Sequence, residues 1–305
     1  MKRRYFFQGA LAVPLALSSY RFRAATEGEA KYIDPHVHIW TDDFKKYPLA
    51  SGTTRADMEL PHFLPEQILN HARPSGVNRV VLVQMSYYGT DNSYMLDMIA
   101  QNPTIFRGIA IIDPNAPNLG RAMADLKSKG IRGFRVPLVD QAGEAALRSG
   151  KLDVLFRTAG IERLAVCPLI NPDYLEALAV ICDRFPQTPV VIDHLGRIGM
   201  SGRIDEYQVR NLCALARFSQ VRVKVSAFYA LGEKRPPHLD LRDLIRRVHY
   251  AFGSRRLMWA SDCPFQILRE PYEASVGLIR DRLDFLSAED KEWLLRRTAE
   301  ELFFS

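Results

Sequence analysis

The sequence predicts a single α/β domain, a (β/α)8 TIM barrel, and two patterns carry that prediction. Apolar runs of four to eight residues recur along the chain, and a segment with helical periodicity follows each of them. Several runs are rich in Val and Ile with little polar alternation, as expected of buried parallel strands. Eight runs alternating with helices are what a closed parallel barrel requires. The length of 305 residues also suits one barrel, which typically takes ~250 residues.

The predicted elements alternate in order along the chain. The strands are expected at residues 32–39, 79–84, 106–112, 131–136, 163–169, 190–193, 221–226 and 257–260. The helices are expected at residues 64–75, 93–101, 118–129, 151–160, 174–185, 205–218 and 239–252, with two more within 272–303. An open doubly wound sheet is the alternative. The Gly-rich turn that it should show after its first strand is absent from residues 34–40.

The composition favours a folded domain with a small-molecule partner. Hydrophobic residues make up 47% of the chain and charged residues 25%, which favours a large core over disorder. The net charge of +6 comes from Lys and Arg scattered along the chain, so it does not predict nucleic-acid binding. This net positive charge is also consistent with attraction of a small anionic substrate. The cysteines show neither CxxC nor zinc-ribbon spacing.

The first 25 residues have the pattern of an export signal. Lys2-Arg3-Arg4 is a basic start, and a mostly apolar run over residues 5–17 follows it. Arg3-Arg4-Tyr5-Phe6-Phe7 also resembles the twin-arginine motif. We therefore expect residues 1–25 to be a twin-arginine signal peptide and residues 26–305 to be the barrel. The mature protein is then periplasmic and has no stable membrane span. A cytoplasmic protein with an N-terminal extension is the alternative.

The first predicted strand carries the sequence Asp34-Pro35-His36-Val37-His38. Residues two apart on a strand face the same side, so His36 and His38 should point together into the barrel mouth. Two imidazoles placed in this way can bind a divalent cation. Taken alone, the pair equally fits two polar side chains in a hydrogen-bond network at a strand end.

Two later strands also lead to ionisable side chains. His194 follows the run at 190–193, and Asp262 follows the run at 257–260. The carboxyl ends of barrel strands form the active-site face, so His36, His194 and Asp262 should meet on one rim. Carboxylates are seldom buried without a partner. Asp262 is therefore a candidate metal ligand or general base.

These strand-end motifs together resemble one known family. Asp34-Pro35-His36-Val37-His38, Asp193-His194-Leu195-Gly196 and Trp259-Ala260-Ser261-Asp262-Cys263-Pro264 are similar to the amidohydrolase superfamily, and more narrowly to its amidohydrolase-2 branch. The resemblance extends from residue 32 to the C-terminus. Further marks resemble the lactonase group of that branch, which includes enzymes like L-fuconolactonase, 2-pyrone-4,6-dicarboxylate lactonase and 4-sulfomuconolactone hydrolase. These marks are Gly133-Phe134-Arg135, Lys224-Val225-Ser226, and Gln84 with Tyr88 and Asn92.

The resemblance implies hydrolysis of a lactone of the sugar-acid or dicarboxylic-acid type. Asp262 is then the general base on water, and His36, His38 and His194 polarise the carbonyl directly or through a metal. The same four side chains are the implied ligands of one divalent metal, with zinc as the expected ion. Lactonases of this kind also include ones that work without a metal, so a metal-free site stays open.

Several side chains are candidates for binding an anionic lactone. Arg135, at the end of the fourth strand, can hold a carboxylate in a bidentate fork, and Arg197 is a second candidate for this task. Lys224 either pairs with Asp193 or touches the substrate. Other side chains are expected to line the mouth: Gln84, Tyr88, Asn92 and Trp40. The sequence leaves a homo-oligomer open.

At several positions this chain differs from the family pattern, and these differences help to choose between the possible functions. Decarboxylases of the branch usually carry a metal-binding His at the end of the fifth strand, where this chain has Cys167 and no His. This counts against the main alternative activity, metal-dependent decarboxylation of an aromatic or unsaturated acid. Ala227 and Ala260 stand where the family often has Gly, and Cys263 where it often has Trp. A non-catalytic binding protein is the other alternative, and retention of all four site residues argues against it.

Overall fold

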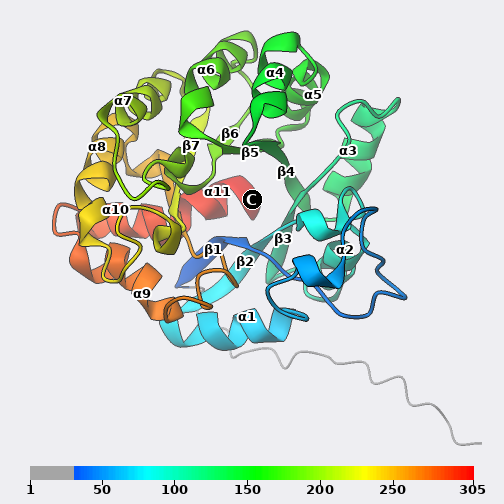
Figure 1. The fold of residues 1–305 in the computed structure, drawn as a ribbon, viewed down its shortest axis with the longest axis horizontal. Helices are drawn as coiled ribbons and strands as arrows, with labels where there is room; N and C mark the ends of the chain where they lie inside the picture. Colours follow the sequence, from blue (N-terminus) through cyan, green and yellow to red (C-terminus); the bar gives the residue numbers. More distant parts are fainter. Residues whose placement is uncertain (1–30) are drawn as a thin grey trace, which may run out of the picture.

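Eight parallel strands follow one another around a ring in sequence order, with the helices outside them (Figure 1). The computed structural model describes residues 31–305, so the expected signal peptide at residues 1–25 lies outside the described residues. The predicted (β/α)8 barrel is confirmed. The strands are β1 (Tyr32–Val37), β2 (Val77–Val83), β3 (Phe106–Ala110), β4 (Ile131–Leu138), β5 (Ala165–Ile170), β6 (Val190–Ile192), β7 (Val221–Ser226) and β8 (Leu257–Ala260).

The ring closes between β1 and the segment after β8. The His38 amide donates to the Cys263 carbonyl at 2.8 Å, and the Asp262 amide donates to the His36 carbonyl at 3.0 Å. A parallel bridge joins Val37 to Cys263. These bonds place the last residues of β1 beside Asp262.

The helices pack around the ring and include one that the sequence did not predict. This helix, α4, begins after Asp140, whose side chain accepts a hydrogen bond from the Gly143 amide. None of the described helices is long and apolar enough to cross a membrane. The α-helices are α1 (Pro65–Ala72), α2 (Ser93–Gln101), α3 (Leu119–Ser128), α4 (Gln141–Ser149), α5 (Asp153–Glu162), α6 (Leu175–Arg184), α7 (Glu206–Ala214), α8 (Arg242–Phe252), α9 (Tyr272–Gly277), α10 (Ala288–Glu292) and α11 (Thr298–Phe303).

The amino-terminal end of the barrel is closed by α11, which crosses the centre of the ring in Figure 1. Ala299 and Phe303 of this helix are buried against side chains from the strands. This interior cluster consists of Ile33, Val81, Val83, Ile109, Ala165, Cys167, Val191, Met258, Ala299 and Phe303. The interior is therefore a packed core, and the carboxyl ends of the strands remain as the open face.

Strand β1 does not keep a simple alternation. Its pairing with β2 is irregular between Asp34 and Val37, around Pro35, which has no amide hydrogen to donate. Ile33 faces the interior cluster, whereas Asp34 accepts a hydrogen bond from the Tyr272 hydroxyl of α9 at 2.8 Å. The irregularity turns the chain so that His36 again lies within the barrel.

Candidate active site at the carboxyl ends of the strands

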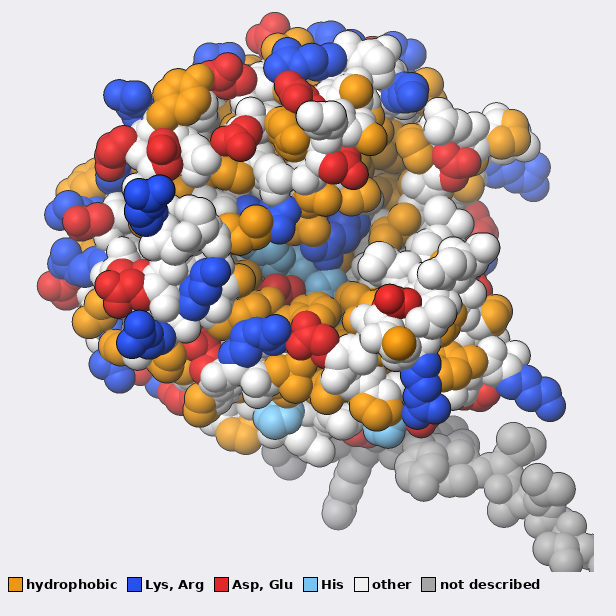
Figure 2. Space-filling model, in the orientation of Figure 1, with side chains coloured by type: hydrophobic (Ala, Val, Ile, Leu, Met, Phe, Trp, Pro, Cys, Tyr) orange, Lys and Arg blue, Asp and Glu red, His pale blue; other side chains and the backbone are white. Residues whose placement is uncertain are grey.

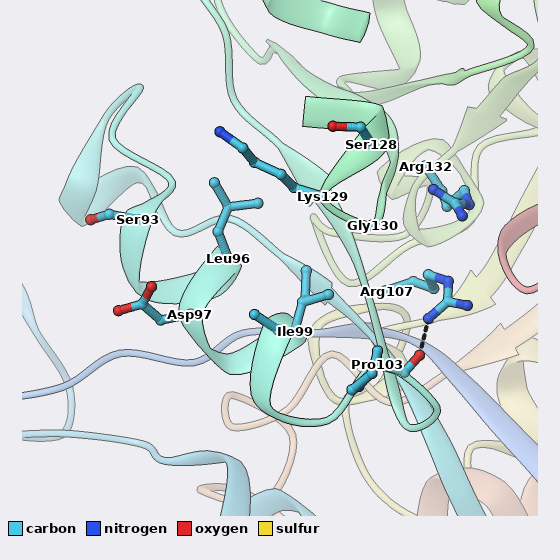
Figure 3. A pocket seen from close by; sticks show the side chains of 11 residues that line it. Ser93, Leu96, Asp97, Ile99, Pro103, Arg107, Ser128, Lys129, Gly130 and Arg132 are labelled. Atoms are coloured by element: carbon cyan, nitrogen blue, oxygen red, sulfur yellow. Dashed lines mark hydrogen bonds between the residues drawn. The ribbon is translucent and has the colours of Figure 1, made fainter. Parts of the chain in front are cut away.

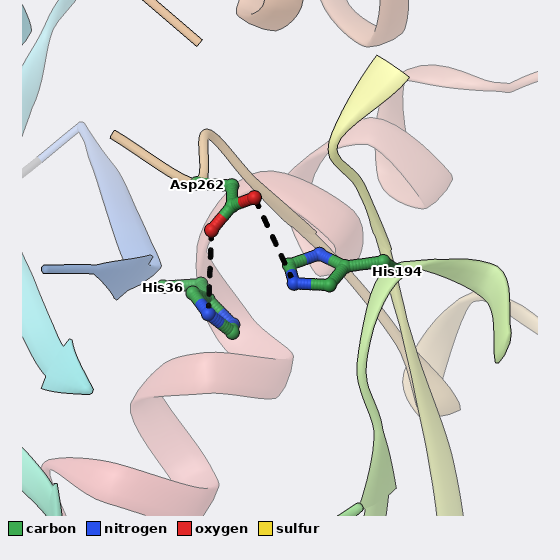
Figure 4. Close-up of side chains that lie close together, drawn as sticks. All are labelled: His36, His194 and Asp262. Carbon is green, nitrogen blue, oxygen red and sulfur yellow. Dashed lines mark ion pairs between the residues drawn. The ribbon is translucent and has the colours of Figure 1, made fainter. Parts of the chain in front are cut away.

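His36, His38, His194 and Asp262 meet at the open end of the barrel, as Figure 4 shows for three of them. The Nε2 atoms of His36 and His38 lie 3.2 Å apart. Oδ1 of Asp262 lies 3.3 Å from Nε2 of His38 and 3.5 Å from Nε2 of His36. Nε2 of His194 lies 3.8 Å from the other oxygen of Asp262. All four residues are buried, so their interactions are shielded from water.

Two of the three imidazoles are oriented by a partner on the ring nitrogen that points away from Asp262. Nδ1 of His38 donates to the Val83 carbonyl oxygen at 2.8 Å, and its Nε2 faces Asp262. Nδ1 of His194 lies 2.9 Å from Oγ of Ser226, at the end of β7. Such partners fix ring orientation in catalytic and metal sites.

A fully buried ion pair between Lys224 and Asp193 contacts the Nδ1 side of the His36 ring. Nζ of Lys224 lies 3.0 Å from both Nδ1 of His36 and Oδ1 of Asp193, and that oxygen lies 3.3 Å from the same Nδ1. All three side chains are inaccessible to solvent, so Lys224 pairs with Asp193 and does not reach the cavity. Burial raises the pKa of Asp193, but Lys224 and His36 more than offset this and hold it well below its usual range. Asp193 is therefore a carboxylate.

Burial favours the neutral form of the His36 and His194 imidazoles. Burial, followed by the nearby Lys224 ammonium, holds the pKa of His36 well below its usual value. Burial also lowers the pKa of His194, although the carboxylates of Asp262 and Asp193 oppose the shift. A neutral imidazole can donate one hydrogen bond and offer one lone pair, which are the two roles that this site requires.

Asp262 is an ionised carboxylate on a strained turn. Burial raises its pKa, but His194, His38 and His36 more than offset this effect, so the pKa lies below its usual range. Its backbone has a φ of 66°, in the left-handed region. Non-glycine residues adopt this region at a cost, and such residues gather at functional sites.

Tyr229 is a site residue that the sequence analysis missed. Its hydroxyl donates to Oδ2 of Asp262 at 2.7 Å. It lies on a short helical turn, Phe228–Ala230, directly after β7. Burial and the Asp262 carboxylate raise the pKa of Tyr229, so the phenol keeps its proton. The only sequence signal was position: Tyr229 follows the Lys224-Val225-Ser226 strand end by three residues.

A cavity of about 210 Å³ opens above the cluster. Figure 2 shows this hollow from outside, with histidine and basic side chains inside it and hydrophobic ones around it. Arg135 reaches the cluster, and its Nη1 lies 3.3 Å from Nε2 of His36 and 3.4 Å from Nε2 of His38. The lining residues are His38, Arg135, Leu169, His194, Arg197, Met200, Ala227, Tyr229, Ala230, Leu231, Asp262 and Phe265.

Four residues predicted to line the mouth do not line this cavity, and their polar atoms are engaged elsewhere. Trp40 Nε1 donates to the Leu60 carbonyl at 2.9 Å, and the Tyr88 hydroxyl accepts from the Thr41 amide at 3.0 Å. The side-chain amides of Gln84 and Asn92 likewise donate to backbone carbonyls.

One nitrogen from each of His36 and His194 and one oxygen of Asp262 lie within 4.8 Å of one another, a group that could hold a metal ion. Two imidazoles and a carboxylate are ligands that zinc accepts. The set fits when the Nδ1 proton of His36 faces Asp193, because Nε2 then has a free lone pair. Lys224 and Arg135 are competing cations at the two nitrogens of this ring.

A larger hollow of about 680 Å³ lies on the outer surface between α2 and α3 (Figure 3). Its two arginines donate to backbone carbonyls. Arg107 donates to the carbonyls of Phe106 and Pro103, and Arg132 donates to those of Ile131 and Lys127. Lys127 lies in the last turn of α3, and the hollow contains none of the clustered histidines.

Comparisons with known proteins show which family the chain belongs to. The chain is 27% identical over 234 residues to an L-fucono-1,5-lactonase of Burkholderia ambifaria, covering 76% of this chain and 80% of that protein. It is also 27% identical over 233 residues to a 4-sulfomuconolactone hydrolase of Rhizobium radiobacter, covering 76% and 75%. An amidohydrolase of Burkholderia multivorans, crystallised with bound zinc, shares the fold with a TM-score of 0.78 at 22% identity, covering 90% and 99%. The family model described as Amidohydrolase matches residues 33–304. The chain therefore belongs to the amidohydrolase family, a family of enzymes.

Proposed function

We propose that this enzyme hydrolyses a lactone, with Asp262 as the general base. The observation that carries the proposal is the placement of Asp262, an ionised carboxylate between three imidazoles at the floor of a small cavity. Two relatives named as lactone hydrolases support the same reaction class.

The reaction needs one proton acceptor and several donors. A water oxygen attacks the lactone carbonyl carbon while Asp262 accepts a proton from that water. Negative charge then grows on the carbonyl oxygen, where imidazole N–H groups and the Arg135 guanidinium stabilise it. The bond between the carbonyl carbon and the ring oxygen breaks, and the ring oxygen takes the proton from Asp262. The product is an open-chain acid, and the carboxylate of Asp262 is restored.

We also propose that the site holds one divalent cation, with zinc as the expected ion. His36, His194 and Asp262 would supply the ligands, with His38 beside them. When bound, the ion would act as a Lewis acid on the carbonyl oxygen. Zinc in the B. multivorans structure supports this choice of ion.

Replacing Asp262 with asparagine tests the base directly. Asp262→Asn keeps the shape of the side chain but cannot accept a proton from water, so kcat on a true lactone substrate should fall by roughly 10²–10⁴-fold. Turnover is measured on a lactone panel, and circular dichroism checks the fold. Asp183→Asn, an exposed change on α6, is the matched control. Near-normal turnover of Asp262→Asn would remove Asp262 from the role of base.

Metal analysis tests whether the site works with a bound zinc ion or with the imidazoles alone. Elemental analysis of the purified protein should show about one zinc per chain, and His194→Ala should lower that content. Chelator-treated protein should regain its activity when zinc is added back. Full activity in protein shown to be metal-free would instead assign the imidazoles as direct donors to the carbonyl.

The position of Cys167 bears on the decarboxylase alternative. Its thiol lies in the interior cluster on β5, and burial raises its pKa to about 12. Within residues 31–305, Cys167 belongs neither to the residues that line the cavity nor to the group that could hold a metal ion. We therefore expect no CO₂ release from aromatic or unsaturated acids.

A further inference from the structure

The walls of the cavity are mostly apolar, whereas its floor consists of ionisable side chains. Above the reacting cluster, six apolar residues form most of the lining: Leu169, Met200, Ala227, Ala230, Leu231 and Phe265. The remaining lining residues are Arg135, Arg197 and Tyr229. No Asn, Gln, Ser, Thr or Glu contributes to this lining within residues 31–305.

The cavity therefore offers few acceptors to a hydroxyl group. Guanidinium groups only donate hydrogen bonds, and the Tyr229 hydroxyl, which donates to Asp262, leaves only its oxygen lone pairs as an acceptor. Among residues 31–305, Asp262 is the only carboxylate in the lining, and the proposed reaction requires it as the base. A buried hydroxyl without an acceptor lowers affinity by roughly 10-fold. Each further unpaired hydroxyl of a sugar lactone lowers the affinity again.

The nearby amide side chains cannot readily make up this shortage. Asn92 donates to the carbonyls of Thr90 and Ile111, both at 2.9 Å, and accepts from the Ile111 amide at 3.1 Å. Gln84 donates to the Asp91 carbonyl. Both side chains are buried. Turning either one toward a substrate would leave backbone groups unpaired.

The two arginines of the lining favour a carboxylate. The polar contacts of Arg135 are with the imidazoles of His36 and His38, and those of Arg197 are with Asn171 and Met200. Neither guanidinium makes an ion pair with any residue in the described part of the chain. Two half-buried guanidinium groups without an ion-pair partner attract an anion and can bind a carboxylate through paired N–H groups.

The volume restricts the substrate further. The cavity of about 210 Å³ is smaller than the roughly 300–1,000 Å³ usual for drug-sized ligands. A single five- or six-membered ring with short substituents is the scale that we expect.

From these features we infer that the substrate is a small, hydroxyl-poor lactone carrying a carboxylate, rather than a polyhydroxylated sugar lactone. The inference rests on the proposed lactone hydrolysis and narrows it. Arg135 and Arg197 hold the carboxylate, and the apolar wall covers the ring. Asp262 and the imidazoles act on the lactone carbonyl at the floor.

The test compares kcat/KM for three probes on the wild-type enzyme. They are an unsaturated five-membered lactone with a carboxymethyl group, the methyl ester of that side chain, and a six-carbon aldonolactone. The free acid should exceed its methyl ester by about 10- to 100-fold, because charge-assisted hydrogen bonds are lost in the ester. It should exceed the aldonolactone by at least as much.

A substitution at Arg197 tests whether this side chain causes the preference for the free acid over its ester. Arg197→Met should reduce the ratio of acid to ester, mainly through a higher KM for the acid. Arg210→Met, an exposed change on α7, should leave the ratio unchanged. The wild-type comparison stands by itself if Arg197→Met does not fold.

Two results would overturn the inference in different ways. A higher kcat/KM for the aldonolactone, or equal values for acid and ester, would reject the substrate class and leave lactone hydrolysis standing. Hydrolysis of none of the probes, nor of any member of a broad lactone panel, would reject the proposed function and the narrower inference with it.

Discussion

The carboxyl end of the barrel contains left-handed backbone and buried charges, whereas the amino end is filled by apolar packing. At the carboxyl ends of β6, β7 and β8, non-glycine residues adopt left-handed backbone conformations: His194, Leu195, Arg197, Ala227 and Asp262. Buried charges lie there as well, including Lys224 and Asp193. At the amino ends, α11 fills the ring with Ala299 and Phe303. An ion pair between Arg79 and Glu300 lies beside this plug.

Most non-glycine residues with left-handed backbone lie at the carboxyl end; among residues 31–305, Arg163, just before β5, is the exception at the amino end. Left-handed backbone costs of order 1–3 kcal/mol per non-glycine residue, and the surrounding structure must hold it in place. The amino-terminal end uses apolar packing, which contributes stability without placing any reactive group. Changes at the amino end should therefore act on stability, and changes at the carboxyl end should act mainly on turnover.

Truncating the plug gives the largest expected effect on stability. Phe303 is fully buried, so Phe303→Ala removes a large side chain and leaves a cavity. The free energy of unfolding should fall by about 3–5 kcal/mol. Denaturant unfolding measures this change, and kcat per folded molecule at low temperature should stay near the wild-type value.

An exposed aromatic residue provides the control for this truncation. Tyr250 on α8 is 82% exposed, so Tyr250→Ala should change stability by less than about 0.5 kcal/mol. A Phe303→Ala protein that kept its stability, or that folded normally but lost turnover, would contradict the division between the two ends.

Removing one hydroxyl at the open end gives a smaller effect of the opposite kind. Tyr229→Phe removes the hydrogen bond to Oδ2 of Asp262, so the carboxylate is held less firmly. A hydrogen bond to a charged group is worth about 1.5–3 kcal/mol, so kcat should fall by about 10-fold or more. KM should change little, because the bond is to the base rather than to the substrate.

Steady-state kinetics separates these two parameters. Tyr207→Phe is a matched control, since it also removes a bond from a phenol to a carboxylate, that of Glu176 on the surface. A rise in KM with unchanged kcat in Tyr229→Phe would show that Tyr229 contacts the substrate instead of positioning the base.

The architecture was predictable from the sequence because strand burial leaves a strong pattern. Every predicted strand overlaps an observed one, and residues 221–226 and 257–260 match β7 and β8 at both ends. Helix α4 was missed although it buries two residues, as α3 and α7 do, because it is followed by a second helix, α5, and so breaks the strand–helix alternation on which the prediction relied. The break in β1 was also missed, since periodicity cannot show where a strand bends.

The site was predictable only in part. His36, His38, His194 and Asp262 follow from strand ends, which the fold brings to one rim. Tyr229 was not predicted, because its direction depends on the left-handed turn at Ala227 and not on strand periodicity. Side chains on loops, such as Trp40 and Asn92, were harder still, because either solvent or backbone groups can satisfy them.

That turn at Ala227 allows the smallest and most local test of the comparison. Ala227 has a φ of 55°, a conformation that glycine adopts without steric cost. Ala227→Gly should therefore raise the free energy of unfolding by about 0.5–1 kcal/mol, since relief of strain is partly offset by a more flexible unfolded chain. Denaturant unfolding measures this gain. Ala146→Gly, within the regular helix α4, should instead lower stability by a similar amount. Destabilisation by both changes would show that the turn at Ala227 is not strained and would remove it from the contrast between the two ends.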